Sequence, residues 1–182
     1  MEIYHMINCF FAFSFLGYLM ECAVLSYEYR QPVTDRGFGH GPFCIIYGFG
    51  AIGACHLLGR FSGNPAMLFF SSMIMATVME LATAHIMIRL FGTFWWDYSG
   101  KMWNYRGIIC LQSSIAWGFL GIFFFGYLDN AVDHMVSRIP APVAPKLAVI
   151  LPCFYLLDFL WCVYRRRQGM DEEETVGRLR VL

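Results

Sequence analysis

Five long apolar stretches constrain this 182-residue chain more than any other feature of its sequence. An α-helix rises 1.5 Å per residue, so about 20 apolar residues cross the roughly 30 Å hydrocarbon core of a bilayer. The chain is 58% hydrophobic and only 14% charged, with a mean hydropathy of +0.53, which leaves too few charged side chains to cover a soluble domain. We therefore predict an all-α, polytopic membrane helix bundle with about five transmembrane helices, at residues 3–25, 43–61, 66–91, 108–128 and 145–164.

The segments between these helices are short and leave no room for a separate catalytic domain. We expect residues 1–164 to form the transmembrane bundle and residues 165–182 to form a cytoplasmic tail that is first basic and then acidic. Residues 62–65 form a turn so short that the helices on either side of it should be antiparallel neighbours. Three prolines predict an extended fourth connection, namely Pro140, Pro142 and Pro145.

Lysine and arginine are distributed unevenly over the predicted connections. If the N-terminus lies outside, ten of the 13 basic residues fall on the cytoplasmic side and three on the other. Positive residues favour the cytoplasmic side of a membrane protein. The bias predicts a multi-pass protein of the plasma membrane with its N-terminus outside and its C-terminus in the cytoplasm.

Composition also argues against several classes of function. The formal net charge is zero, whereas nucleic-acid binding needs a clustered basic excess, so we expect no nucleic-acid partner. The seven cysteines lie mostly inside apolar stretches, and the spacing of cysteine, histidine and carboxylate residues matches no metal signature. A nucleotide-cradling glycine loop is also missing from the sequence. We therefore expect no metal and no cofactor, and any ATP would be bound by a separate subunit.

Two of the predicted connections carry polar motifs. The first, residues 35–42, places three glycines around Arg36 and His40, and such a loop lets backbone approach a ligand closely. The second, residues 94–107, combines three tryptophans with polar side chains, and its candidate residues are Trp96, Asp97, Asn104 and Arg106. Because the two connections are first and third in order, they lie on the same side of the membrane, and the charge bias makes that side cytoplasmic.

Ionisable side chains also occur inside the apolar stretches. Glu21 lies near the cytoplasmic end of the first helix, Glu80 lies deeper in the third, and Asp158 interrupts the fifth. A charge in hydrocarbon costs about 2.5–3.5 kcal/mol, so each needs a partner, a proton or a water-filled cavity. We expect Arg36 or Arg106 to neutralise the two glutamates in one pocket beneath both loops, and Asp158 to face the bundle interior or to snorkel. As alternatives, polar contacts that only hold helices together explain the glutamates, and an aromatic belt explains the tryptophans.

Several separated motifs occur in one order along residues 14–121, and with them the chain resembles a bacterial family of membrane proteins described as putative ABC-transporter type IV. The motifs are SFLGY at 14–18 with Glu21, DRGF at 35–38, GP at 41–42, CIIYG at 44–48, Glu80, WWDYS at 95–99, Asn104, Gly107, CL at 110–111 and WG at 117–118. The chain departs from the family pattern at four positions, where the family tends to have Trp, Asn, Pro and Arg in place of Tyr18, Asp35, Ile45 and Ile108. The resemblance implies a permease-like protein of about five helices, in which Arg106 is a candidate to replace the arginine absent at position 108.

These residues are consistent with three functions. The first is an integral membrane transport protein, a permease-like subunit that would need a separate ATPase if ATP drives it, and whose small size predicts a homodimer in the lipid bilayer. Its polar, cytoplasm-facing cavity would be lined by Glu21, Arg36, His40, Glu80, Trp96, Asp97, Asn104 and Arg106.

The second is a membrane-embedded enzyme acting on a lipid or amphipathic substrate at the cytoplasmic interface. Its candidate catalytic residues are Glu21, His40 and Asp97, with Glu21 or His40 as general base and Asp97 orienting it. The third is a non-transporting assembly or regulatory subunit whose polar motifs hold the helices in register.

Overall fold

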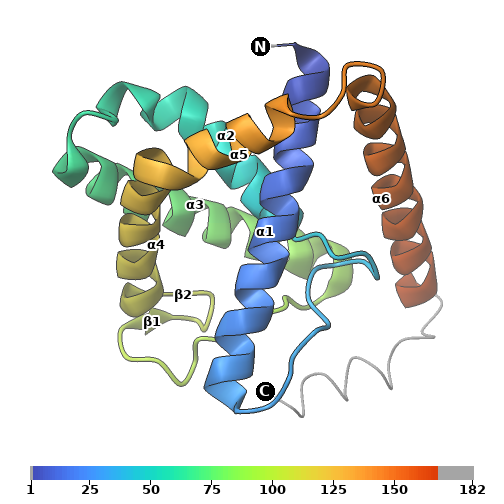
Figure 1. Ribbon diagram of the computed structural model, residues 1–182. Coiled ribbons are helices and arrows are strands. Elements are labelled where there is room, and N and C mark those ends of the chain that lie inside the picture. The colour runs from blue at the N-terminus through green and yellow to red at the C-terminus, as the bar shows by residue number, and fades with distance from the viewer. Residues whose placement is uncertain (1, 168–182) are drawn as a thin grey trace. The chain divides into compact units, whose positions relative to one another are not determined.

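The computed structural model describes residues 2–167, and almost all of their regular structure is helical (Figure 1). The helical elements are α1 (Ile3–Tyr29), α2 (Ile45–Leu58) with the 3₁₀ turn η1 (Gly59–Phe61), α3 (Pro65–Phe91), α4 (Leu111–Phe123) with the π-helical turn η2 (Phe124–Leu128), α5 (Asp129–Ser137) and α6 (Ala144–Arg167). Two strands of two residues each, β1 (Asn104–Tyr105) and β2 (Ile109–Cys110), pair in antiparallel fashion. The predicted all-α membrane fold is confirmed. The predicted tail from residue 168 onward lies outside the described residues.

Long apolar helices make this chain a multi-pass membrane protein. Among the residues that the structure describes, four helical segments are long and apolar enough to cross a membrane, namely Ile3–Tyr29, Pro65–Phe91, Leu111–Ser137 and Ala144–Arg165. They expose many large apolar side chains, as lipid-facing helices do. The second predicted helix is shorter than these, because the 14 residues of α2 and the three of η1 fall below the roughly 20 needed for a full crossing.

The fourth helix begins and ends later than the predicted range of 108–128. Residues 109–110 pair in β2, and the helix starts at Leu111, where the Sγ atom of Cys110 accepts the backbone N–H of Ser113 at 3.3 Å. At its other end α4 continues through η2 and α5 to Ser137.

The prediction of an extended fourth connection was wrong, because α5 takes up most of that segment. Only residues 138–143 are left between α5 and α6, and the backbone N–H of Val143 donates to the carbonyl of Pro140 at 2.8 Å in a tight turn. Pro145 lies in the first turn of α6, where a missing N–H costs no helical hydrogen bond.

The turn between η1 and α3 is as short as predicted. Asn64 caps α3, and its side-chain oxygen accepts the backbone N–H groups of Ala66 and Met67, each at 3.1 Å. Pro65 occupies the first helical position, where its fixed φ suits helix initiation. At the other end, Gly92 stops the helix in the left-handed region, with φ of +74°.

Contacts divide the described chain into two compact units. The first comprises residues 2–52 and 131–167 and so holds α1, the start of α2, most of α5, and α6. The second comprises residues 53–130 and holds the end of α2, α3, the β1–β2 hairpin and α4. Each unit therefore carries one motif loop, residues 30–44 in the first and residues 92–110 in the second.

In the first unit, α1 packs against α6, and the two helices run in the same direction (Figure 1). The side-chain amide of Asn8 donates to the carbonyl of Ala144, the first residue of α6, at 3.0 Å. Cys9, Val132 and Val136 are buried in this unit. The contact holds the N-terminal end of α6 against α1, and Asp158 in the C-terminal half of α6 contacts the loop of residues 30–44.

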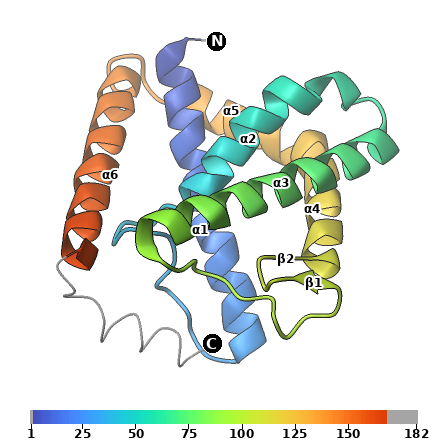
Figure 2. The same cartoon turned by 180° about the vertical axis from the view of Figure 1, so that it is seen from behind.

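In the second unit, α3 packs closely against α4, and the β1–β2 hairpin precedes the start of α4 (Figure 2). A Cβ atom added to Gly118 would lie 2.6 Å from the ring of Phe69, and one added to Gly121 would collide with the side chain of Ser72. Small residues of this kind let helix backbones approach each other inside a membrane. The approach brings polar side chains of α3 and α4 into direct contact.

Candidate functional site

Glu80 is a buried carboxylate in the middle of α3, in the second unit. Only 5% of the residue is exposed. Its Oε1 atom accepts hydrogen bonds from the hydroxyl of Tyr98 at 3.0 Å and from the hydroxyl of Ser113 at 3.2 Å, and the two hydroxyl oxygens lie 3.3 Å apart. Three elements thus converge on one oxygen: α3, the loop of residues 92–110, and α4. We call Glu80, Tyr98 and Ser113 the Glu80 cluster.

A second polar contact joins α3 and α4 about one turn away from Glu80. The hydroxyls of Thr77 and Ser114 lie 2.8 Å apart, and the Thr77 hydroxyl also donates to the carbonyl of Met73 at 2.7 Å. Since Thr77 has a single hydroxyl proton, Ser114 is the donor in the contact between the helices. The interface between α3 and α4 therefore contains two polar contacts about one helical turn apart.

The loop of residues 92–110 is closed by its own hydrogen bonds. Asp97 Oδ1 accepts the backbone N–H of Ser99 at 2.8 Å, and the backbone N–H of Tyr98 donates to the carbonyl of Gly107 at 2.8 Å. Asn104 donates to the carbonyls of Ser99 and Lys101 and accepts the N–H of Gly107 at 3.1 Å. These bonds hold the backbone on both sides of Tyr98 and so fix where its hydroxyl points.

Gly107 and Trp96 complete the closure of this loop. Gly107 has φ of +70°, and a Cβ atom there would lie 2.6 Å from both Asp97 Oδ1 and Ser99 Oγ, so only glycine fits without strain. The indole N–H of Trp96 donates to the carbonyl of Ile108 at 2.7 Å. Trp96 therefore connects the start of the loop to the residue that precedes β2.

Hydrogen bonding and burial shift two pKa values in the loop in opposite directions. The side chain and the backbone N–H of Ser99 donate to Asp97 and lower the pKa of its carboxyl, so Asp97 is ionised at neutral pH. Burial, reinforced by the nearby negative charge of Glu80, raises the pKa of the Tyr98 hydroxyl. Tyr98 therefore keeps its proton and remains a hydrogen-bond donor to Glu80.

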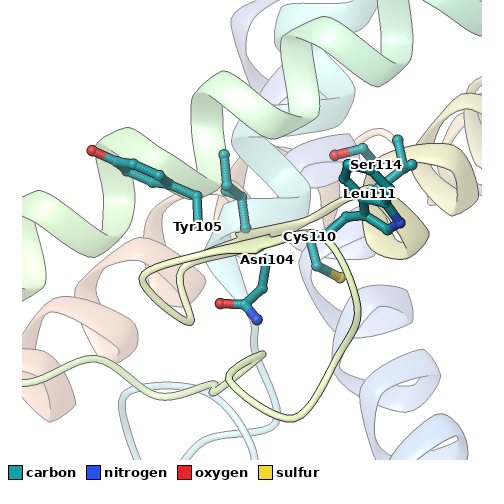
Figure 3. Close-up of a pocket in the computed structure, with 7 residues that line it drawn as sticks. Asn104, Tyr105, Cys110, Leu111 and Ser114 are labelled. Carbon is teal, nitrogen blue, oxygen red and sulfur yellow. The ribbon is translucent and has the colours of Figure 1, made fainter.

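A shallow depression of about 370 Å³ lies beside the hairpin at the start of α4 (Figure 3). It is lined by Trp103, Asn104, Tyr105, Ile109, Cys110, Leu111 and Ser114. Arg106 is exposed next to it, with its guanidinium carbon 5.5 Å from the centre of the Tyr105 ring. Asn104 is the one residue of the predicted cavity that lines this depression.

In the first unit, Glu21 is also contacted by a tyrosine. The hydroxyl of Tyr47 donates to Glu21 Oε1 at 2.9 Å. Arg36 lies within electrostatic range of Glu21, and its Nε atom is buried without a hydrogen-bond partner among the described residues. The first unit thus combines a carboxylate, a tyrosine hydroxyl and a guanidinium toward the C-terminal end of α1.

Close packing of α1 against the start of α2 places Tyr47 beside Glu21. Ser14 is fully buried, and a Cβ atom on Gly48 would lie 2.5 Å from its hydroxyl oxygen. A Cβ atom on Gly17 would collide with the ring of Tyr47. The two glycines therefore let the helices approach until the tyrosine lies directly over α1 and its hydroxyl reaches Glu21.

His40 and Asp158 fasten the loop of residues 30–44 to α6. Asp158 Oδ2 accepts the backbone N–H of His40 at 2.7 Å and that of Gly41 at 3.1 Å, and Asp158 Oδ1 lies 2.8 Å from Nδ1 of the His40 ring. Gly39 has no room for a Cβ atom, which would collide with the Asp158 carboxylate. The carboxylate within the fifth apolar stretch thus holds a loop that lies more than 100 residues earlier in the sequence.

Two groups of side chains in the first unit could hold a metal ion. They are His5 with Cys9 and Asp133, and His40 with Asp158 and Cys162. In each group the candidate ligand atoms lie within 4.8 Å of one another. Sequence spacing did not indicate them, because each group joins residues that are more than 100 positions apart.

Comparison with known proteins decides the family. The model of the family described as putative ABC-transporter type IV matches residues 8–163. The chain belongs to this family. No curated protein and no solved structure matches it.

Membership of the type IV family confirms the resemblance inferred from the sequence motifs. In this member, motif residues from 14 to 48 pack α1 against α2, and motif residues from 95 to 107 close the second loop. Together with its apolar helices, the family makes this a membrane protein related to transport.

The candidate residues of this type IV family member fall into separate groups. Glu21 and Arg36 lie near each other in the first unit, and His40 pairs with Asp158 there. In the second unit, Glu80 lies under the loop that carries Trp96, Asp97, Asn104 and Arg106. The single pocket beneath both loops stays a prediction.

Four residues that contact the candidate carboxylates or loops were missed as site residues: Tyr47, Tyr98, Ser113 and Asp158. Three of them contribute a hydroxyl, a group too common in membrane proteins to stand out. Tyr98 lay within the recognised WWDYS motif, and its position directly beside Asp97 was the one signal available.

Proposed function

We propose that this chain is an integral membrane transport protein, the permease-like membrane subunit of a transporter whose ATP, if ATP drives it, is bound by a separate ATPase subunit. The observation that carries the proposal is the Glu80 cluster. A carboxylate within an apolar helix is costly, and such residues mark substrate and ion pathways when they face the protein interior. Glu80 is 5% exposed and holds two hydroxyl donors, so it faces protein rather than lipid.

The cluster suits a carrier site because its hydrogen bonds are exchangeable. Tyr98 and Ser113 donate to one carboxylate oxygen, and a cation or a donor group of a substrate would compete for the same oxygen. Displacing Tyr98 would break the hydrogen bond through which the loop of residues 92–110 contacts Glu80 on α3. Occupancy of the carboxylate and position of the loop are therefore coupled.

Glu21 repeats the same arrangement in the first unit, where Tyr47 donates to its carboxylate. Arg36 adds a positive charge within electrostatic range of this carboxylate. In the proposed transporter, Glu21, Arg36, His40, Glu80, Trp96, Asp97, Asn104 and Arg106 line or support a polar cavity that opens to the cytoplasm.

The proposed topology places the N-terminus outside the plasma membrane and the C-terminus in the cytoplasm. For both motif loops to face the cytoplasm, the shorter segment Ile45–Phe61 has to cross as well. Its length of about 25 Å at 1.5 Å per residue is accommodated by modest local thinning of the bilayer. The small size of the chain supports a homodimer as the working form.

Copurification and flux test the proposal directly. The full chain, extracted from native membranes in mild detergent, is expected to carry a stoichiometric subunit with ATPase activity, or to support substrate flux after reconstitution into liposomes. If the purified chain brings no ATPase and mediates no flux in a screen of ions and small solutes, the transport proposal fails.

An enzyme acting on a lipid or amphipathic substrate is the second candidate, and the pair of His40 and Asp158 favours it. A histidine oriented by a carboxylate is the usual arrangement of a general base. The His40 side chain is 58% exposed, so a substrate can reach it, and Asp158 takes the orienting role expected of Asp97. Lipid profiles of cells that carry His40→Gln should change if this reading is correct, and unchanged profiles would exclude it.

A further inference from the structure

Three candidate ligand atoms of different chemistry converge at the C-terminal half of α6. Nδ1 of His40 lies 2.8 Å from Oδ1 of Asp158 and 3.5 Å from Sγ of Cys162, and the sulfur lies 3.9 Å from the same carboxylate oxygen. Asp158 and Cys162 are four residues apart, so they share one face of the helix. His40 reaches them from the loop of residues 30–44.

These distances are close to the edges of a tetrahedral metal site. Zinc binds imidazole nitrogen and carboxylate oxygen at about 2.0–2.2 Å and thiolate sulfur at about 2.3 Å, which places neighbouring ligand atoms roughly 3.3–3.6 Å apart. The contact between His40 and Cys162 already has this length. The contact between Cys162 and Asp158 is slightly long, and that between His40 and Asp158 is short because it is now a hydrogen bond. Shifts well below 1 Å would complete the site.

The ligand types select the class of metal. Imidazole and thiolate favour zinc and related transition metals, whereas calcium and magnesium prefer oxygen ligands alone. Three protein ligands leave a fourth position for water or another donor. The His40 side chain is 58% exposed and that of Asp158 is 13% exposed, so an ion can enter from the His40 side.

The surroundings of the cluster already hold its carboxylate in place. Asp158 Oδ2 accepts the backbone N–H groups of His40 and Gly41, so the carboxylate is oriented and its other oxygen faces the imidazole and the thiol. Outer hydrogen bonds of this kind orient ligands in known metal sites. Gly39 provides the space that the carboxylate needs.

We propose that His40, Asp158 and Cys162 bind a divalent transition-metal ion of the zinc type, which clamps the loop of residues 30–44 onto α6. On binding, the Cys162 thiol loses its proton to solvent, and neutral His40 shifts its ring proton from Nδ1 to Nε2 so that Nδ1 donates its lone pair to the ion. The clamp does not depend on the transport proposal and holds for an assembly subunit as well.

The other group, His5 with Cys9 and Asp133, has the same composition. The test therefore has to distinguish metal binding at this group from binding at the proposed site. Its carboxylate is more exposed, at 58% for the Asp133 side chain, and contacts Nε2 of His5 at 2.7 Å. A variant with His5→Gln and Cys9→Ala removes this group and serves as the background for the measurements.

Metal titration of the full chain in detergent tests the site. After chelator treatment, Co²⁺ absorption and Zn²⁺ calorimetry of the background variant are expected to show one equivalent bound, with the charge-transfer band of a cobalt–thiolate bond. Cys162→Ala should abolish that band and weaken binding at least tenfold, and His40→Gln should weaken binding similarly. Cys153→Ala, which removes an exposed cysteine of the same helix, should change neither.

Two results would overturn the site. One is an unchanged cobalt–thiolate band in Cys162→Ala, and the other is unchanged affinity in a folded His40→Gln, whose exposed side chain makes loss of the fold unexpected. The clamp has its own readout, because Zn²⁺ should slow amide hydrogen exchange in residues 30–44 of the background variant and have no such effect in Cys162→Ala. Equal exchange with and without bound Zn²⁺ would refute the clamp.

Discussion

The hydroxyl of Tyr98 donates a 3.0 Å hydrogen bond to Oε1 of Glu80, so a side chain from a loop outside the helices reaches a carboxylate buried on α3. Ser113 of α4 completes the contact. The relationship gives a role to Asp97 and Asn104 in the loop that follows α3, since their hydrogen bonds within the loop place the tyrosine. Because the contact uses one oxygen of Glu80, a glutamine can keep that oxygen while removing the charge. The function of the charge can therefore be tested apart from the contribution of Glu80 to stability.

Glu80→Gln is the variant that separates charge from packing. The amide keeps an oxygen that Tyr98 and Ser113 can reach, so the melting temperature should change little, by the equivalent of about 1 kcal/mol or less. Transport, or the ATPase activity of a copurified subunit, should fall at least tenfold because the negative charge is lost. Glu28→Gln, an exposed glutamate near the end of α1, is the matched control. Retained activity with lowered stability would instead assign the cluster to an assembly subunit.

Tyr98→Phe should destabilise the second unit. The substitution removes one of the two hydroxyl donors to a buried carboxylate, and loss of such a hydrogen bond to a charged group costs about 1.5–3 kcal/mol. Tyr105→Phe in the same loop, where the tyrosine is 53% exposed, should be neutral. Thermal unfolding in detergent measures both, and equal melting temperatures for the two variants would show that the hydroxyl of Tyr98 does not stabilise the fold.

Alkaline pH should weaken the same contact. The pKa of Tyr98 is raised above its ordinary value of 10.0, first by burial and then by Glu80. In the unfolded chain Tyr98 loses its proton near pH 10, whereas in the folded chain it retains it. The stability that this tyrosine contributes is therefore complete below pH 10 and is lost as the pH rises beyond that value. The loss above pH 10 should be smaller in Tyr98→Phe, and parallel curves for both proteins would contradict the assignment.

Gly48→Ala should disturb the packing of α1 against α2. The added methyl group would lie 2.5 Å from Ser14 Oγ and 2.7 Å from the carbonyl oxygen of Phe10, and such overpacking costs about 1–3 kcal/mol. Gly53→Ala in the same helix meets nothing within 4 Å and should be neutral or slightly stabilising, since alanine favours helix more than glycine does. Melting temperatures that rank the two variants the other way would refute the close contact.

The two lysines of the chain provide a native test of topology. Lys101 lies in the second motif loop and Lys146 at the start of α6, and the proposed orientation places them on opposite sides of the membrane. A membrane-impermeant amine reagent applied to intact spheroplasts should modify Lys146 and spare Lys101, and both should react after permeabilisation. Lys101→Arg and Lys146→Arg identify the labelled residue by mass spectrometry. Labelling of Lys101 in intact spheroplasts would reverse the orientation or remove the crossing by Ile45–Phe61.

The sequence by itself determined the helical membrane fold, the family, and the need of Glu80 for a polar partner. Hydropathy is a sum over residues that are neighbours in the sequence, and the cost of placing a charge in hydrocarbon depends on a single residue. Both can therefore be evaluated without coordinates. The boundaries of the fourth helix were harder to predict from the sequence. At its start, β2 forms only through its pairing with β1, and at its end the helix continues through polar residues to Ser137.

Only the tertiary structure decided which groups meet. Glu80 is paired with Tyr98 and Ser113, and Asp158 receives the loop around His40 from 118 residues away. Hydrogen-bond partners depend on how closely helices approach, and here that approach is controlled by glycines such as Gly48 and Gly121, which face serines on the opposing helices. A change of a few tenths of an ångström in distance makes or breaks a polar contact. The pattern of residues along the sequence does not encode the distances between residues that are far apart in it.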